Sequence, residues 1–296
     1  MTFPCPNWLR VVLLGLDITV FLPQIWRIWS QKTSTGLSLL YIFFILLSAT
    51  ERFTNAFFGA VNWTIAGANA PGFFVHDPRT IGDWLNLVQL GVDWVLLLLL
   101  FILCLTYPPP YYRSQAHTRI LSAILYTTFA LISIIPLFID ALFPSIFHEP
   151  GERQPDFGVA IFAGFHLFFL NTICTLLSIC SIIPQAIQLS SLSLDSGVVR
   201  VRDLVVQAVV LTMLAVSWVF RVSLPSGVDV LTPLRSIAWY VRVGWPAGGT
   251  GVFAIVQGGL AVLGMMGRRR VCGSVGGEGE TDPLMGGSRN VVAERA

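Results

Sequence analysis

The sequence predicts an all-α integral membrane protein, with seven transmembrane helices arranged as two parallel three-helix bundles that a linker helix joins. Three observations predict it: few charged residues, seven long apolar stretches, and a pattern that recurs later in the chain. Of the 296 residues, 54% are hydrophobic and 11% are charged, whereas about 25% are charged in an ordinary soluble domain. Because a soluble protein must be wetted over its whole surface, this deficit indicates that much of the surface faces lipid.

Seven stretches are long and apolar enough to cross a bilayer as helices, which takes about 20 residues each. They are residues 10–29, 37–60, 84–106, 119–143, 158–189, 203–220 and 245–267. The first stretch contains Asp17 and lacks the small-residue cleavage site of a signal peptide. We therefore interpret it as a spanning helix.

A short pattern near the end of the first stretch recurs near the end of the fifth. The pairs Pro23–Gln24 and Pro184–Gln185 are separated by 184 − 23 = 161 residues. The same offset matches Gly36 with Gly197 and Trp84 with Trp245. The first three helices therefore match the last three, and a single helix between them gives both triplets the same orientation. We expect a first repeat over 1–107, a linker helix with its loops over 108–157, a second repeat over 158–267 and a disordered cytosolic tail over 268–296.

The residues around the first pair resemble the first motif of the PQ-loop repeat family. The run from Pro23 to Ser38 has Pro–Gln, the basic Lys32, a hydroxyl residue, Gly36 and Ser at that family's spacing. The second copy departs from the motif, because Ser193 stands where the first copy has Lys32. The resemblance extends over residues 10–267. It implies a relation to lysosomal exporters of cystine and cationic amino acids, and to sugar-efflux transporters.

A proline inside a helix removes one backbone hydrogen bond and kinks the helix. In lipid the freed carbonyl needs another partner, and a neighbouring glutamine amide can supply one or bridge to another helix. Kinks at matched positions predict hinges about which one half rocks against the other, with a static kink as the alternative. The hinge and motif residues are Pro23, Gln24, Lys32, Gly36, Pro184, Gln185 and Gly197.

Polar side chains recur at helical spacing within several of the apolar stretches, which predicts a shared polar cavity. The predicted substrate-binding residues are Asn86, Gln89, Asp93, Arg52 and Asn171. Arg52 could hold a carboxylate of the solute. Asp93 and Glu51 lie near mid-bilayer, where the neutral form of a carboxyl group is favoured, so either could carry a proton. A structural ion pair with Arg52 is the alternative, and His166 is interpreted as a packing residue.

These observations predict a membrane transporter of a small polar solute that alternates its access by bending at the Pro–Gln kinks. The resemblance favours an amino acid as the solute, and the acids within the apolar stretches would allow proton coupling. Two alternatives stay open: a non-transporting receptor or scaffold on the same fold, and a sugar transporter. The sequence has no nucleophile–base constellation, metal-ligand spacing or phosphate-binding loop. We therefore expect no enzyme activity, no cofactor, no metal and no nucleic-acid partner; a homodimer remains open.

The placement of basic residues predicts a lumenal N-terminus and a cytosolic C-terminus, because three arginines directly follow the last apolar stretch. Arg10 and Arg221 then count among the lumenal charges, and Asn62 begins a lumenal glycosylation sequon. The tail resembles an acidic dileucine sorting signal, which implies a vacuolar or lysosomal membrane and binding to a clathrin adaptor. A chance match is the alternative. The residues concerned are Glu280, Leu284 and Met285.

Overall fold

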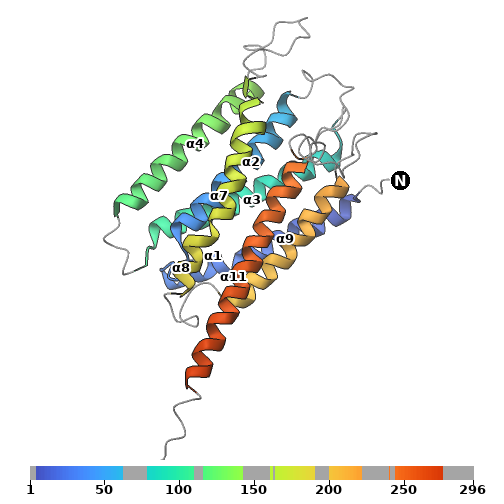
Figure 1. The fold of residues 1–296 in the computed structure, drawn as a ribbon. Coiled ribbons are helices and arrows are strands. Elements are labelled where there is room, and N and C mark those ends of the chain that lie inside the picture. Colours follow the sequence, from blue (N-terminus) through green and yellow to red (C-terminus); the bar gives the residue numbers. More distant parts are fainter. Residues whose placement is uncertain are drawn as a thin grey trace, which may run out of the picture.

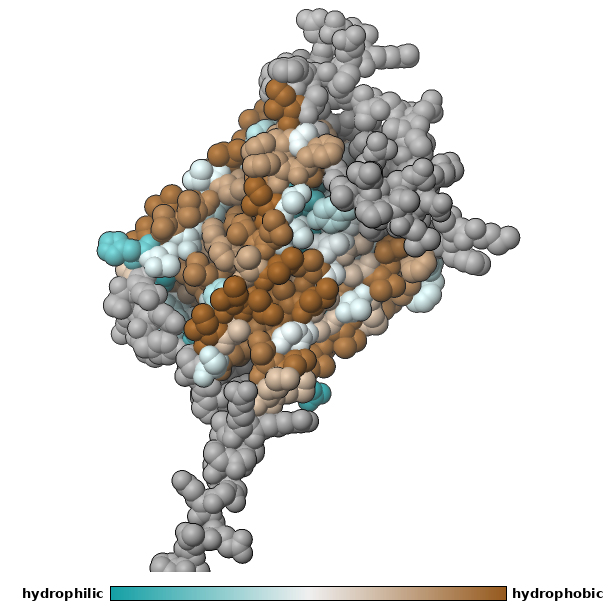
Figure 2. Space-filling model, in the orientation of Figure 1, coloured by the Kyte–Doolittle hydropathy of each residue, from teal (hydrophilic) through white to brown (hydrophobic). Residues whose placement is uncertain are grey.

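The computed structural model describes residues 5–62, 79–109, 116–142, 161–162, 164–190, 200–221, 240 and 244–275, with the backbone alone from 268 onward. This part of the chain is helical and contains no β-strand. Six helical segments are long and apolar enough to span a membrane. They are α1 (Asn7–Gln31), α3 (Ile81–Thr106), α4 (Ala116–Leu142), the segment Phe165–Ser190, α9 (Val201–Arg221) and α11 (Trp245–Val275), of which Trp245–Gly267 is the spanning part. These helices run side by side in one bundle, with apolar side chains over much of the visible face (Figures 1 and 2).

The seventh expected helix is α2 (Leu39–Asn62), and it differs from the other six in being buried over most of its length. Its second half carries Glu51, Arg52 and Asn55, all of which are buried. These polar groups lower its apolar character, so α2 is not among the six helices that qualify as spans by composition. A helix with so many buried polar groups needs protein neighbours on several sides, and α2 packs against α3, α4 and α11 and against the segment Phe165–Ser190.

We call α1, α2 and α3 the first group of helices, and the segment Phe165–Ser190, α9 and α11 the second group. In the first group α3 packs against both α1 and α2, and in the second α11 packs against both α9 and the segment Phe165–Ser190. The groups meet where α1 packs against α9 and where α2 packs against α7 (Asn171–Cys180). α4 packs against α2 and lies at the outer edge of the bundle (Figure 1).

The two Pro–Gln pairs lie in helices of different regularity. α1 continues without interruption through Pro23. The segment Phe165–Ser190 begins as the π-helix η3 (Phe165–Leu170), continues as α7, and is interrupted at Ser181 before α8 (Ile182–Ser190). Because Pro184 has no N–H to offer the carbonyl one turn earlier, this interruption lies where the α-helical hydrogen bonding is weakest.

The ends of two helices are defined by local residues. α3 begins with a capping box, in which the Thr80 hydroxyl accepts from the Asp83 amide and the Asp83 carboxylate accepts from the Thr80 amide at 2.8 Å. α1 ends at Lys32, which adopts the left-handed conformation with φ 53°, and Gly36 in the following turn has φ 92°. We call residues 32–38 the α1–α2 turn, and the end of the bundle that carries it the turn end. The opposite end, where α1 begins, is called the N-terminal end.

Candidate functional site

A cluster of charged and polar side chains lies inside the bundle where α1, α2, α3 and α11 meet; its members are Asp17, Arg52, Gln89, Asp93 and Thr250. Asp17 is 0% exposed and accepts a hydrogen bond from Gln89 Nε2 at 2.9 Å. Asp93 lies beside Asp17, and Arg52 is close enough to both carboxylates to interact with their charge. Arg52 Nη1 donates to Thr250 Oγ1 at 2.9 Å. We call this set the aspartate–arginine cluster.

The chemistry of this cluster is set by its two carboxylates. When both are ionised they repel each other, and the repulsion is strong where water is excluded. Oδ1 of Asp17 and Oδ1 of Asp93 have no hydrogen-bond partner among the described residues. The cluster is therefore suited to bind a proton or a cationic group of a solute.

The inner face of α3 contributes most of the predicted substrate-binding residues. Asn86, Gln89 and Asp93 follow each other at spacings of three and four residues, so they lie on one face of the helix. All three are buried, which agrees with the expectation that they face the interior. Asn171, on α7, is buried as well, and its Nδ2 has no hydrogen-bond partner in the described part of the chain.

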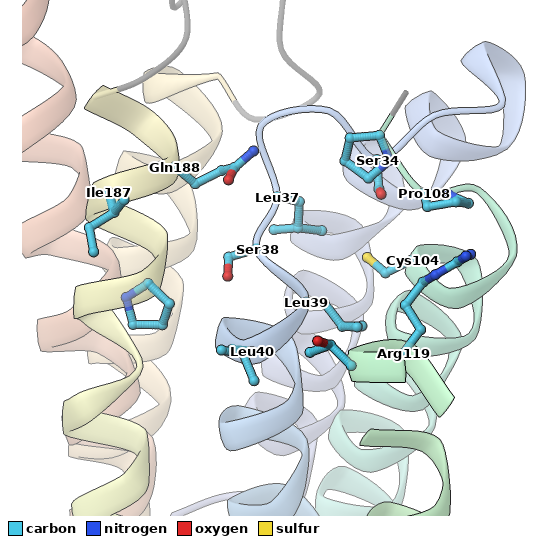
Figure 3. Close-up of a pocket in the computed structure, with 13 residues that line it drawn as sticks. Ser34, Leu37, Ser38, Leu39, Leu40, Cys104, Pro108, Arg119, Ile187 and Gln188 are labelled. Atoms are coloured by element: carbon cyan, nitrogen blue, oxygen red, sulfur yellow. The ribbon is translucent and has the colours of Figure 1, made fainter. Parts of the chain in front are cut away.

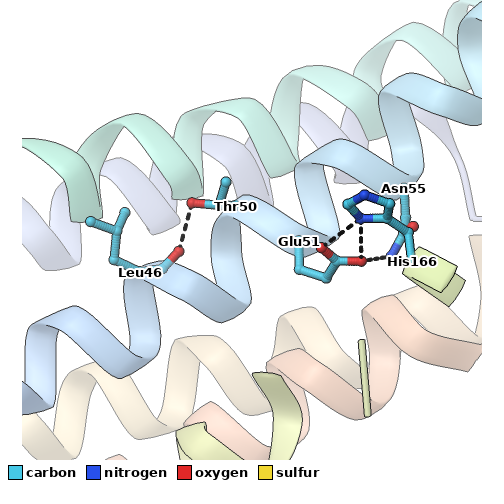
Figure 4. Close-up of polar contacts among 5 residues, drawn as sticks. All are labelled: Leu46, Thr50, Glu51, Asn55 and His166. Carbon is cyan, nitrogen blue, oxygen red and sulfur yellow. Dashed lines mark hydrogen bonds and ion pairs between the residues drawn. The ribbon is translucent and has the colours of Figure 1, made fainter. Parts of the chain in front are cut away.

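A second pair of ionisable groups, Glu51 and His166, joins α2 to η3 (Figure 4). His166 Nδ1 lies 3.0 and 2.9 Å from the two carboxylate oxygens of Glu51, and Asn55 Nδ2 donates to Glu51 at 3.2 Å. The ring of Phe162 stacks on the His166 imidazole with centroids 4.1 Å apart. Glu51 and His166 can share one proton, which either the carboxylate or the imidazole can carry.

This pairing differs from the ion pair between Glu51 and Arg52 that the sequence left open. Consecutive residues of a helix point about 100° apart, so Glu51 and Arg52 reach different neighbours. His166 is well satisfied, as expected of a packing residue, but its partner is a carboxylate. Glu51 and His166 are 115 residues apart, and the only sequence signal for the pair is that both are ionisable residues in apolar stretches.

Two arginines meet near the N-terminal end of the bundle interior. Nη1 of Arg10 lies 3.4 Å from Asn86 Oδ1, and Nη1 of Arg221 lies 3.5 Å from the same oxygen. From the sequence we counted both arginines among the lumenal charges. The structure adds that their side chains turn inward and are buried.

Each glutamine of the Pro–Gln pairs bonds a segment of the other group of helices. Gln185 Nε2 donates to the Gly36 carbonyl at 2.8 Å, and Gln185 Oε1 accepts from the Ser38 amide at 2.8 Å. Gln24 Oε1 accepts from Gln207 Nε2 on α9 at 3.3 Å, and Gln207 Nε2 also lies 3.1 Å from the Val20 carbonyl. The Pro–Gln glutamines thus connect helices, as one of the two roles expected for them requires.

An ion pair between Arg27 of α1 and Asp203 of α9 reinforces this connection. Arg27 lies close to one turn beyond Gln24, so the two contacts follow each other along the α1–α9 interface. At the turn end, therefore, the two groups of helices are held together both by α1 on α9 and by α8 on the α1–α2 turn.

A cavity of about 220 Å³ lies beside the second Pro–Gln pair (Figure 3). It is bounded by the α1–α2 turn, the end of α3, the start of α4 and α8. Pro184 is part of its wall, together with the polar side chains of Ser38, Arg119 and Gln188. The helix around Pro184 thus borders open space, into which it can bend.

Of the remaining predicted residues, Lys32 and Asn62 are described by the structure and four others are not. Lys32 Nζ donates to the Tyr107 hydroxyl at 3.1 Å and lies 3.9 Å from the centroid of the Trp29 ring, so Lys32 anchors the end of α1 among aromatic side chains. Asn62 is the last residue of α2. The rest lie outside the described residues: Gly197, Glu280, Leu284 and Met285.

In the described part of the chain, no group of three or more His, Cys, Asp or Glu side chains could hold a metal ion.

The polar interior of the bundle contains acids, arginines and amides. Its members recur every seven residues on α1, at Arg10, Asp17 and Gln24. That spacing keeps them on one face, which runs from the N-terminal end to the turn end.

Comparison of the chain with curated proteins and with solved structures gives no significant match. A family model does match: residues 7–65 fit the PQ loop repeat. The matched residues contain α1, the α1–α2 turn and α2, with Pro23–Gln24 and Gly36 among them. The resemblance stated from the sequence is thereby confirmed for the first copy of the motif, since residues 7–65 match the PQ loop repeat.

Proposed function

We propose that this protein is a membrane transporter that carries a small polar solute, foremost an amino acid, by rocking one three-helix group against the other. The observation that carries the proposal is the aspartate–arginine cluster. Its residues come from both groups, since Thr250 lies on α11 and the other four on α1, α2 and α3. Buried ionisable groups between spanning helices mark solute or ion pathways in membrane proteins, and binding sites of transporters lie between their repeats near the midplane.

The proposed 3+1+3 arrangement is supported by the packing order. In each group the third helix lies against both of the others, and the groups meet through α1 with α9 and through α2 with α7. These two contacts are equivalent if the groups are related by a two-fold axis, because each joins a first helix to a second helix. α4 takes the place of the linker.

Bending at the Pro–Gln pairs is supported by the contacts at the turn end. Gln185 on the α1–α2 turn and Gln24 on Gln207 hold that end of the bundle together, and the cavity next to Pro184 gives the helix room to move. Release of these contacts would open the turn end, while the cluster stays at the centre.

Proton coupling is supported by the side-by-side carboxylates of Asp17 and Asp93. A proton bound between the two carboxylates would remove their repulsion. A cationic group of an arriving solute would take over this role, and the proton would then leave. Glu51 is a second proton carrier in this proposal, with His166 as its exchange partner. The proposed location is a vacuolar or lysosomal membrane, with the N-terminus in the lumen and the tail available to a clathrin adaptor.

The experiment is uptake by the purified full chain in proteoliposomes under an imposed pH gradient, with a panel of labelled amino acids and sugars. We expect accumulation of an amino acid, and we expect Asp93→Asn to lower pH-driven uptake at least tenfold. Asp140→Asn is the matched control, because Asp140 is a buried aspartate on α4, away from the cluster.

Two results would count against the proposal. Uptake of none of the solutes would favour a receptor or scaffold. Gradient-driven uptake that is unchanged in Asp93→Asn, Asp17→Asn and Glu51→Gln would leave transport in place but would exclude these acids as proton carriers.

A further inference from the structure

Arg10 and Arg221 share one weak acceptor although they are buried. Both nearest nitrogens approach the same neutral amide oxygen, Asn86 Oδ1, at 3.4 and 3.5 Å. These distances are at the long end for hydrogen bonds, and two cations converge on an atom without a formal charge. Such an arrangement of like charges is costly where water is excluded.

Several donors of the two guanidinium groups have no partner among the described residues. Arg10 is 9% exposed and Arg221 is 6% exposed. Nε of Arg10, together with Nε and Nη2 of Arg221, has no hydrogen-bond partner among the described residues. Arg221 also lies near Cys5 and is close enough to Asp93 to interact with its charge. A guanidinium group has five N–H donors in a fixed fork, however, and unpaired donors on a buried charge are unfavourable. The pair is therefore placed for an acceptor with negative charge.

Neighbouring residues hold both side chains in this position. The guanidinium carbon of Arg221 lies over the Trp218 ring, 4.4 Å from its centroid, so a cation–π contact helps to hold the side chain. On the other side, a Cβ atom at Gly82 would lie 2.3 Å from Nη1 of Arg10. The absence of a side chain at Gly82 thus makes the space that the Arg10 guanidinium occupies. The pair is a positioned feature of the interior.

A carboxylate fits these donors best. It offers two oxygens in one plane, and arginine binds it through two parallel hydrogen bonds. We propose that Arg10 and Arg221 bind the carboxylate group of the transported solute. This rests on the transport function proposed above and names the chemical group that the solute must carry. Neutral sugars lack it, so the arginine pair selects against them.

The position of the pair suits this role. Asn86 and Asp93 are seven residues apart on one face of α3, or about 10 Å along the helix axis. The pair thus lies between the N-terminal end of the bundle and the aspartate–arginine cluster. A solute entering from that end would meet the arginines first, and its carboxylate would be held before the rest of the molecule reaches the acids.

The test is binding to the purified full chain in detergent, measured by the shift in its thermal unfolding temperature. The probes are acetate and glycine, with acetamide and glycinamide as neutral matches, and with chloride and inorganic phosphate at equal ionic strength. We expect acetate and glycine to raise the Tm, and the amides and inorganic anions to leave it unchanged. We expect Arg221→Gln and Arg10→Gln to weaken carboxylate binding by about tenfold to a hundredfold, as for loss of a charged hydrogen bond.

Three comparisons sharpen the test. Arg79→Gln is the matched control, because Arg79 lies at the same end and is exposed. Gly82→Ala retains every charge but crowds Arg10, and it should weaken acetate binding even if the arginine variants fail to fold. Arg221→Lys should bind more weakly than the wild type, because lysine lacks the planar fork.

The proposal is overturned if the amides shift the Tm as much as the acids, if phosphate or chloride does so, or if the folded arginine variants bind acetate as the wild type does. Since no transport is measured, carboxylate binding without uptake in proteoliposomes would overturn the transport function and leave the site. Uptake without carboxylate binding would support the transport function and overturn the arginine site.

Discussion

The two Pro–Gln pairs have the same sequence, yet they lie in different surroundings. Pro23 lies in a continuous helix and lines an open pocket with Trp26 and Leu99. Pro184 follows an interruption at Ser181 and borders a cavity. Gln24 contacts one side chain of α9, whereas Gln185 bonds two backbone groups of the α1–α2 turn. We therefore expect bending to be concentrated in the second copy, where the helix is already interrupted, with the first copy as the more rigid support.

The largest expected effect on stability comes from Gln185→Leu. This change leaves the Gly36 carbonyl and the Ser38 amide without their partner, and each unsatisfied buried group costs about 1–3 kcal/mol. We expect a loss of about 2–4 kcal/mol, measured as a lower thermal unfolding temperature in detergent. Gln31→Leu serves as the control, because Gln31 is exposed at the end of α1. Equal stability of the Gln185 and Gln31 variants would remove the distinction between the copies.

A smaller effect is expected from Gln24→Leu. Its contact with Gln207 is a single hydrogen bond of 3.3 Å between side chains, and one such bond contributes about 1 kcal/mol. Gln207→Leu and the double variant complete a cycle that isolates the coupling between the two side chains. If Gln24→Leu destabilised the protein more than Gln185→Leu, the order of the two copies would have to be reversed.

The smallest effect is expected from Arg27→Gln at the α1–α9 interface. The ion pair with Asp203 is partly exposed, with 14% and 21% of the two side chains accessible, and such pairs contribute about 0.2–1 kcal/mol. We expect a small drop in Tm that disappears at high salt, because salt screens exposed charges. Arg200→Gln, at an exposed position near the start of α9, is the control. A salt-independent loss would show that Arg27 acts through packing.

The helices could be predicted from the sequence because apolar length and periodicity are local properties. The expected stretch 84–106 became Ile81–Thr106, and 203–220 became Val201–Arg221. The inward face of α3 followed from the spacing of Asn86, Gln89 and Asp93 in the same way.

The partners of the polar side chains could not be predicted, because they depend on how distant helices pack. The sequence left open an ion pair of Glu51 with Arg52, whereas Glu51 pairs with His166 from another helix. Arg10 and Arg221 lie at the ends of apolar stretches, where an arginine more often extends into water. Only the packing of α1, α3 and α9 brings them to one amide oxygen.

Gln185 binds only main-chain atoms of the α1–α2 turn, the Gly36 carbonyl and the Ser38 amide. These two hydrogen bonds therefore do not depend on the side chains of the turn. Gly36 is the exception, because other residues rarely adopt its φ of 92°. Mutations at Thr33 or Thr35, which are partly exposed, can change the surface that the turn presents to other molecules while the two hydrogen bonds stay the same. The exposed surface of the turn can therefore change in sequence while the contact between α8 and the α1–α2 turn is preserved.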